Sequence, residues 1–216
     1  MIFEKELVIF ANSVKTGQHC VAGKEIKTKQ WVRPVSSENG GSLSDSIVKY
    51  PNKGRLWEVK PLDKILIKFN KPAPLKNQPD NWMISEQTWE TRYKITRDEV
   101  YSYRDTPENL WLKQDCLQDR QDRVDFESIK TGNYKISQSL YLIFVDKINL
   151  YTRNRLDKGL QTRGNFEYNG MQYDFALTDP NFFHDLNQKT LENKFLCISL
   201  GAELNGYCYK IIASVI

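Results

Sequence analysis

Turn residues divide the carboxyl-terminal part of the chain into short apolar segments, and this pattern leaves few folds open. Asn169-Gly170 separates two such segments and predicts a two-residue type I′ hairpin turn. Residues 145–151 alternate strictly between apolar and polar side chains, as a half-buried strand does. The expected strands are residues 139–151, 165–168, 171–177, 194–200 and 206–216. So many short strands in about 80 residues predict a small β-barrel.

The first third of the chain predicts a second small barrel. Residues 6–14, 20–23 and 30–36 are spaced like a β-meander, and residues 62–69 form a further strand. Residues 37–55 are rich in Gly, Ser and Pro, which predicts a long loop with at most one helical turn.

Between the barrels, charged residues predominate and strand patterns are weak. Thr106 followed by Pro107 is typical of a helix start, with Thr106 as the N-cap. We therefore predict a mainly β protein with an amino-terminal barrel at 1–84, a helical or irregular bridge at 85–136 and a carboxyl-terminal barrel at 137–216.

Composition and cysteine use indicate a soluble protein. The chain is 40% apolar and 27% charged, which is enough for a packed core. Its apolar runs are far shorter than the roughly 20 residues of a membrane helix, and the charged start is no signal peptide. The four cysteines are widely spaced without a C-x-x-C pair. A cytoplasmic, reduced protein is expected.

Positive charge is concentrated in the first third of the chain. Residues 1–78 carry 14 Lys and Arg against 7 Asp and Glu, whereas residues 137–216 carry 8 of each. Clustered cations favour a polyanionic partner such as nucleic acid. The alternative is an ordinary lysine-rich surface.

No catalytic or metal motif stands out in the sequence. The nucleophile-elbow, phosphate-loop and dinucleotide motifs are absent, and the two histidines, His19 and His184, are not spaced as zinc ligands. Five acids at 115–127 are interleaved with Arg120 and Arg123, which is typical of a solvated surface and less so of a metal site. We expect no catalytic residue, no metal and no cofactor. An enzyme would need a site that this sequence does not reveal.

Aromatic and basic residues together mark the candidate binding site. Trp31 and Arg33 share one face of a predicted strand, and Lys15 is near in sequence. Small barrels bind single-stranded nucleic acid by stacking bases on exposed rings beside a cationic groove. Tyr209-Lys210 is a weaker instance of the same pairing. The alternative is that Trp31 belongs to the core and Arg33 pairs with an acid.

Several phrases in combination resemble the bacterial dual OB-containing domain family. They are residues 13–23 (SVKTGQHCVAG), 31–36 (WVRPVS), 78–82 (QPDNW), 177–180 (LTDP), 196–201 (LCISLG) and 206–213 (GYCYKIIA). The resemblance covers nearly the whole chain and implies two OB-type barrels. It also implies a role with nucleic acid or nucleotides, in a bacterial defence setting.

Positions that match these phrases become candidate contacts, chiefly Lys15, Trp31, Arg33 and Lys210. The predicted function is a non-catalytic nucleic-acid-binding module, with single-stranded DNA or RNA favoured. The alternatives are a protein–protein adaptor subunit of a larger complex and a sensor of a nucleotide or modified base.

Overall fold

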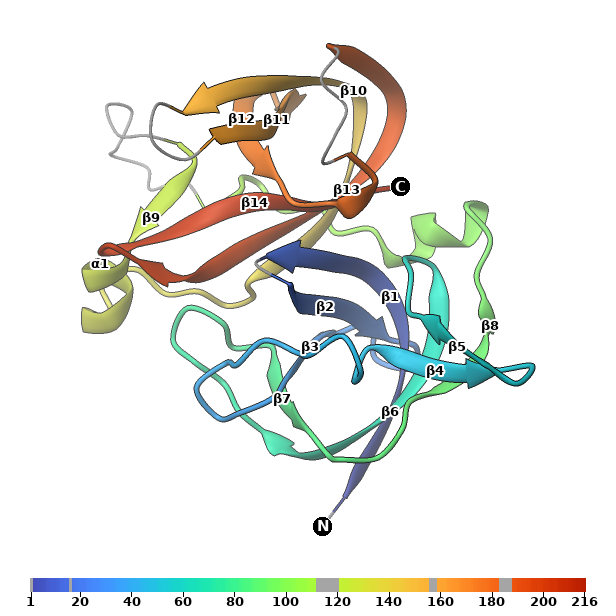
Figure 1. Cartoon of the computed structure of the whole chain (residues 1–216). Helices are drawn as coiled ribbons and strands as arrows, with labels where there is room; N and C mark the ends of the chain where they lie inside the picture. Colours follow the sequence, from blue (N-terminus) through green and yellow to red (C-terminus); the bar gives the residue numbers. More distant parts are fainter. Residues whose placement is uncertain (1, 16, 112–120, 156–158, 183–187) are drawn as a thin grey trace.

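The computed structural model places the chain in two β-barrels that pack against each other, joined by a partly helical segment (Figure 1). It describes residues 2–15, 17–111, 121–155, 159–182 and 188–216, and the side chain of Lys15 lies outside this description. Within these ranges no helix is long and apolar enough to cross a membrane. The predicted fold, mainly β with two small barrels, is confirmed.

The first barrel closes because its first strand pairs on both sides. β1 pairs with β2 at one edge and with β6 at the other, so the sheet order β1-β2-β3-β7-β6 returns to its start. The β3–β7 pair is parallel and β8 extends the sheet beyond β6. Alternate apolar residues such as Ile9, Val21 and Ile67 fill the interior. The strands are β1 (Phe3–Lys15), β2 (Gln18–Glu25), β3 (Trp31–Val35), β6 (Asp63–Pro72), β7 (Asn81–Ile84) and β8 (Glu90–Lys94).

The second barrel repeats this connectivity. Its order is β10-β11-β12-β14-β13, closed by the β13–β10 pair, and β12 and β14 are parallel. At Gly164 an added Cβ would lie 2.6 Å from Ile212 Cδ1. The absence of a side chain here therefore lets Ile212 pack against the backbone of β11. The elements are β9 (Arg123–Asp125), β10 (Leu140–Arg155), β11 (Gly159–Tyr168), β12 (Met171–Leu177), η2 (Pro180–Phe182), β13 (Lys189–Leu204) and β14 (Tyr207–Val215). β9 flanks the barrel beside β14.

The hairpin expected at Asn169-Gly170 is confirmed. Tyr168 and Met171 are paired across it, and Asn169 and Gly170 have φ angles of 51° and 74°. Two consecutive positive φ angles define the type I′ turn that the sequence predicts.

The helix predicted to start at Thr106 is wrong. Residues 104–107 run without helix or strand after η1 (Asp98–Tyr103). The carbonyl of Pro107 accepts hydrogen bonds from Tyr168 and Asn169 of the second barrel, and Glu108 accepts one from Asn169. These contacts take up carbonyls that a helix would need for its own bonds. The α-helix of the segment, α1 (Phe126–Thr131), instead begins after Asp125, whose carboxylate accepts from the Ser128 amide.

The predicted loop at 37–55 runs into a β-ribbon. β4 (Lys49–Asn52) and β5 (Arg55–Glu58) pair as a hairpin, with Lys53 and Gly54 at positive φ in its turn. The ribbon projects from the first barrel beside β8 (Figure 1). The sequence does not predict β4, because it contains Pro51 and proline is rare inside paired strands.

Candidate nucleic-acid interface

Trp31 is buried at the boundary between the two barrels. It is 5% exposed, and its indole Nε1 donates to Asp105 Oδ2 at 2.9 Å. The ring also packs edge-on against Phe10. Trp31 therefore offers no open stacking surface, and the sequence-based expectation of an exposed ring here is corrected.

Arg33 lies beside Trp31 on the same outer face of β3, and it is also enclosed. It is 7% exposed, and its Nη2 donates to Ser139 Oγ at 2.9 Å and Ser199 Oγ at 3.1 Å, both in the second barrel. Burial lowers the pKa of the guanidinium, and the negative charge of Asp80 partly offsets this. Its hydrogen bonds thus join the barrels, and it is not available to an external phosphate.

Apolar residues and one carboxylate complete this contact, which we call the seam. The Asp105 carboxylate accepts from Lys24 Nζ, Trp31 Nε1 and the Leu142 amide, so it ties both barrels to the joining segment. The apolar part of the seam comes from the outer strand faces of both barrels: Val8, Phe10, Ala11, Ala22, Leu140, Leu142, Phe195, Cys197 and Ala213. The second barrel consequently covers most of the outer face of β1, β2 and β3, and Cys20 on β2 stays exposed.

The other predicted contacts lie away from Trp31 and Arg33. Lys15 ends β1, and its side chain is outside the described part of the structure. Tyr209 and Lys210 belong to β14 of the second barrel; Tyr209 is half-buried with its ring near Tyr207. Lys210 is 2% exposed, and burial lowers its pKa to about 7. An exposed contact at Lys210 is therefore corrected as well.

The corresponding face of the second barrel is open. Outward side chains on β10, β11 and β12 alternate with interior ones, and they are almost all polar: Lys147, Asn149, Tyr151, Arg163, Asn165, Glu167, Gln172 and Asp174. Strand register places Asn149, Asn165 and Asp174 in one row across the three strands. We call this surface the β10–β12 face.

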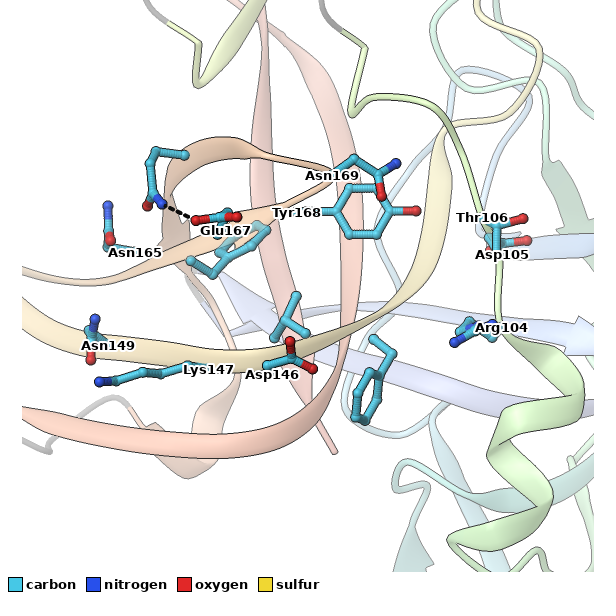
Figure 2. A pocket seen from close by; sticks show the side chains of 14 residues that line it. Arg104, Asp105, Thr106, Asp146, Lys147, Asn149, Asn165, Glu167, Tyr168 and Asn169 are labelled. Carbon is cyan, nitrogen blue, oxygen red and sulfur yellow. Dashed lines mark hydrogen bonds between the residues drawn. The ribbon is translucent and has the colours of Figure 1, made fainter.

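A cleft of about 620 Å³ lies over this face and reaches the joining segment. Figure 2 shows Arg104 and Asp105 at one end, Asn149 and Asn165 at the other, and Tyr168 between them. The Tyr168 hydroxyl donates to the Pro107 carbonyl at 2.9 Å, and burial raises its pKa.

The cleft is rich in amides and nearly balanced in charge. Cations are supplied by Arg104 and Lys147, and acids by Asp105, Asp146 and Glu167. The side chain of Asn165 makes no hydrogen bond to any part of the chain that the structure describes. Such a lining suits a polar ligand with hydrogen-bonding edges and a flat ring better than a bare polyanion.

A second, shallower hollow of about 370 Å³ continues along the same face. Here Arg163 Nε donates to Asp174 Oδ1 at 2.8 Å, and the Tyr151 hydroxyl donates to the same carboxylate. Asp122 lies 3.6 Å from Arg163 Nη2. These ion pairs fix the side chains of the face in place.

Comparison with known proteins agrees with the connectivity of the barrels. Residues 5–215 match the family model described as the dual OB-containing domain. The chain belongs to the dual OB-containing domain family. No curated protein sequence matches it. Among solved structures, a crystal structure of the tetrameric p202 HIN2 matches with 7% identity, covering 99% of this chain and 92% of that one. The TM-score of 0.33 is too low to support any statement about function.

Membership of the dual OB-containing domain family relates the β10–β12 face to a surface found in other OB-folds. OB-folds bind oligonucleotides and oligosaccharides on the face of their second and third strands. In this dual OB protein those strands are β2 and β3 in the first barrel, and β11 and β12 in the second. The seam covers most of the first of these faces, while the cleft opens on the second.

Sequence reasoning missed the β10–β12 face, although a signal was present. The polar residues that alternate with apolar ones on either side of Asn169-Gly170 include Asn149, Asn165 and Gln172. Amides at regularly outward positions beside a well-predicted hairpin would have located the face. Trp31 and Arg33, to which the aromatic and basic pattern points, lie in the seam instead.

The described residues contain no cluster of three or more His, Cys, Asp or Glu side chains placed to hold a metal ion. Of the acidic run, Asp122 lies near Arg163, and Asp125 caps α1. Asp115, Asp119 and His184 lie outside the residues that the structure describes.

Proposed function

We propose that this dual OB protein is a non-catalytic module that binds single-stranded DNA or RNA on the β10–β12 face. One observation carries the proposal: of the two equivalent OB faces, the one on the second barrel is open and hollowed by a cleft lined with amides and Tyr168. The seam occupies the other face, so the second barrel is the one left to bind.

The lining favours contact with bases over contact with phosphates. Amide side chains such as Asn149, Asn165 and Gln172 can pair with the edges of unstacked bases, and the Tyr168 ring offers a partial stacking surface. Arg104 and Lys147 are placed to meet phosphates at opposite ends of the cleft. Because acids balance these cations, we expect a weaker dependence on salt than a strongly basic groove would give.

The test is fluorescence anisotropy with labelled single-stranded DNA and RNA, at about 50 mM salt and micromolar protein, where counterion release favours binding. The double variant Asn165→Ala/Lys147→Ala should bind about tenfold more weakly or worse, since one good base contact contributes about 1–3 kcal/mol. Lys135→Ala is the matched control, because Lys135 is exposed and lines neither hollow. Absence of binding by the unaltered protein would remove the proposal.

A second candidate is a sensor of a nucleotide or modified base. The observation that favours it is the cleft volume of about 620 Å³, since small-molecule sites span roughly 300–1,000 Å³. Thermal shift with mononucleotides separates the two candidates. A mononucleotide should raise the melting temperature of a sensor, and a longer strand should raise it no further. An oligonucleotide-binding module should be stabilised by the longer strand and not by a mononucleotide.

A further inference from the structure

The exposed Trp and Tyr rings of the described surface lie in one region. Trp57, Tyr93 and Tyr101 are 50%, 60% and 53% exposed, and every other Trp and Tyr in the described ranges is buried or partly buried. All three lie on elements that follow one another in space, namely the β4–β5 ribbon, β8 and η1. Rings of this size are usually largely buried, and exposed rings gathered on one surface are typical of an interaction site.

The three elements lead directly to the cleft. β4 lies beside β8, and the chain continues from β8 to η1 (Figure 1). Arg104 directly follows η1 and lines the cleft. The ring centroids of Tyr101 and Phe144 are 5.7 Å apart, and Phe144 also lines the cleft. We call the surface from the ribbon to Tyr101 the ring track.

Cations accompany the rings along the whole track. They are Lys49, Lys53, Arg55, Lys60, Arg92, Lys94, Arg97 and Arg104, against the acids Glu58, Glu90, Asp98 and Glu99. Several of these charges are already engaged: Lys94 pairs with Asp63, Arg92 with Glu90, and Glu99 accepts from Thr96. Lys53 in the turn of the ribbon and Arg55 directly after it make no side-chain hydrogen bond or ion pair within the described residues.

The combination matches the chemistry of a single nucleic-acid strand. Each base presents a flat face that stacks on Trp or Tyr, and each phosphate is met by Lys or Arg. A folded acidic protein could pair with the cations. Binding of such a protein would not explain the exposed rings that accompany them.

We propose that a strand held in the cleft continues along the ring track, with bases stacked on Tyr101, Tyr93 and Trp57 and phosphates contacted by the neighbouring cations. This inference rests on the proposed function and extends it. It makes the binding site longer than one OB face and assigns the β4–β5 ribbon as its far end.

The test compares oligothymidylates of about 5 and about 20 nucleotides, lengths that bracket the site size of one OB face. The unaltered protein should bind the longer strand at least tenfold more tightly. Trp57→Ala/Tyr93→Ala should lose at least fivefold in affinity for the longer strand, the minimum expected for one lost stacking contact, and keep its affinity for the shorter one. Leu204→Ala is the control, because Leu204 is an exposed apolar residue at the end of β13 and outside the track.

The outcomes separate the track from the cleft. Equal affinity for both lengths, or an unchanged affinity of the double variant for the longer strand, overturns the track and leaves the cleft proposal in place. No binding of either length overturns both. As a second readout that does not depend on an alanine variant folding, the longer strand should quench the fluorescence of exposed Trp57, and Trp57→Phe should abolish that quenching. Unchanged Trp57 emission in the saturated complex also overturns the track.

Discussion

Replacement of Lys210 by methionine should stabilise the protein, and by more at pH 7 than at pH 9. Lys210 points into the second barrel from β14, where it is 2% exposed. Burial lowers its pKa from 10.5 to about 7, although nearby Asp122 acts in the opposite direction. Methionine has a similar length and no charge, so it removes the desolvation cost without leaving a large cavity.

The sign of the pH dependence follows from proton binding. Between pH 7 and pH 10.5 the lysine is largely neutral in the folded state and protonated in the unfolded state. Because the unfolded state then binds more protons, the free energy of unfolding rises with pH, at up to about 1.4 kcal/mol per unit. From pH 7 to pH 9, titration of Lys210 raises the free energy of unfolding of the unaltered protein by about 2 kcal/mol. The methionine variant lacks this contribution. The advantage of Lys210→Met should shrink by that amount.

Urea unfolding of both proteins at pH 7, 8 and 9 measures the effect. The pKa values of the Cys197 and Cys208 thiols are raised by burial to about 12 and about 11, which lowers stability as the pH rises above their unfolded values. Both proteins share these thiols, so the difference between the two curves isolates Lys210. A difference that stays constant from pH 7 to pH 9 would refute the assignment of a neutral buried lysine.

Three further predictions concern the seam, the second barrel and the thiols. Asp105→Ala should lower the free energy of unfolding by about 3–5 kcal/mol in urea, because it leaves three donors including a buried ammonium without their acceptor; a loss below about 1 kcal/mol, the value of an exposed pair, would contradict this role. Gly164→Ala should cost about 1–3 kcal/mol by the same assay, since its Cβ would meet an isoleucine methyl at 2.6 Å, and an unchanged midpoint would count against the described packing. A thiol reagent should modify exposed Cys20 in the native protein and reach Cys197 and Cys208 only on unfolding, as followed by peptide mass spectrometry; equal rates at the three sites would contradict their burial.

The strand pattern of the second barrel could be predicted because local rules determine it. Asn169-Gly170 specifies its turn without help from distant residues, and alternation identifies the strands on each side. The helix at Thr106 failed for the opposite reason, because its carbonyls are bonded by Tyr168 and Asn169, some 60 residues away in sequence. A local capping signal carries no information about such partners.

The candidate site was mislocated because sequence shows which residues share a face, but not what covers that face. Trp31 and Arg33 do lie on one outer strand face, as alternation predicts. What alternation cannot show is that Ser139 and Ser199 of the other barrel close over it. The ring track could not be predicted for a related reason. Trp57 and Tyr93 come to lie on one surface only because β8 pairs with β6 and the β4–β5 ribbon lies beside β8.

The seam also constrains how the protein can be made on a ribosome. The Ser214 hydroxyl donates to the Phe10 carbonyl, a contact that spans 204 residues of sequence. At about 5–20 residues per second, roughly 10–40 seconds pass between the synthesis of Phe10 and that of Ser214. Until the second barrel has been synthesised, its side of the seam is missing and Phe10 and Trp31 lack their cover, so this apolar surface exposes the nascent chain to aggregation.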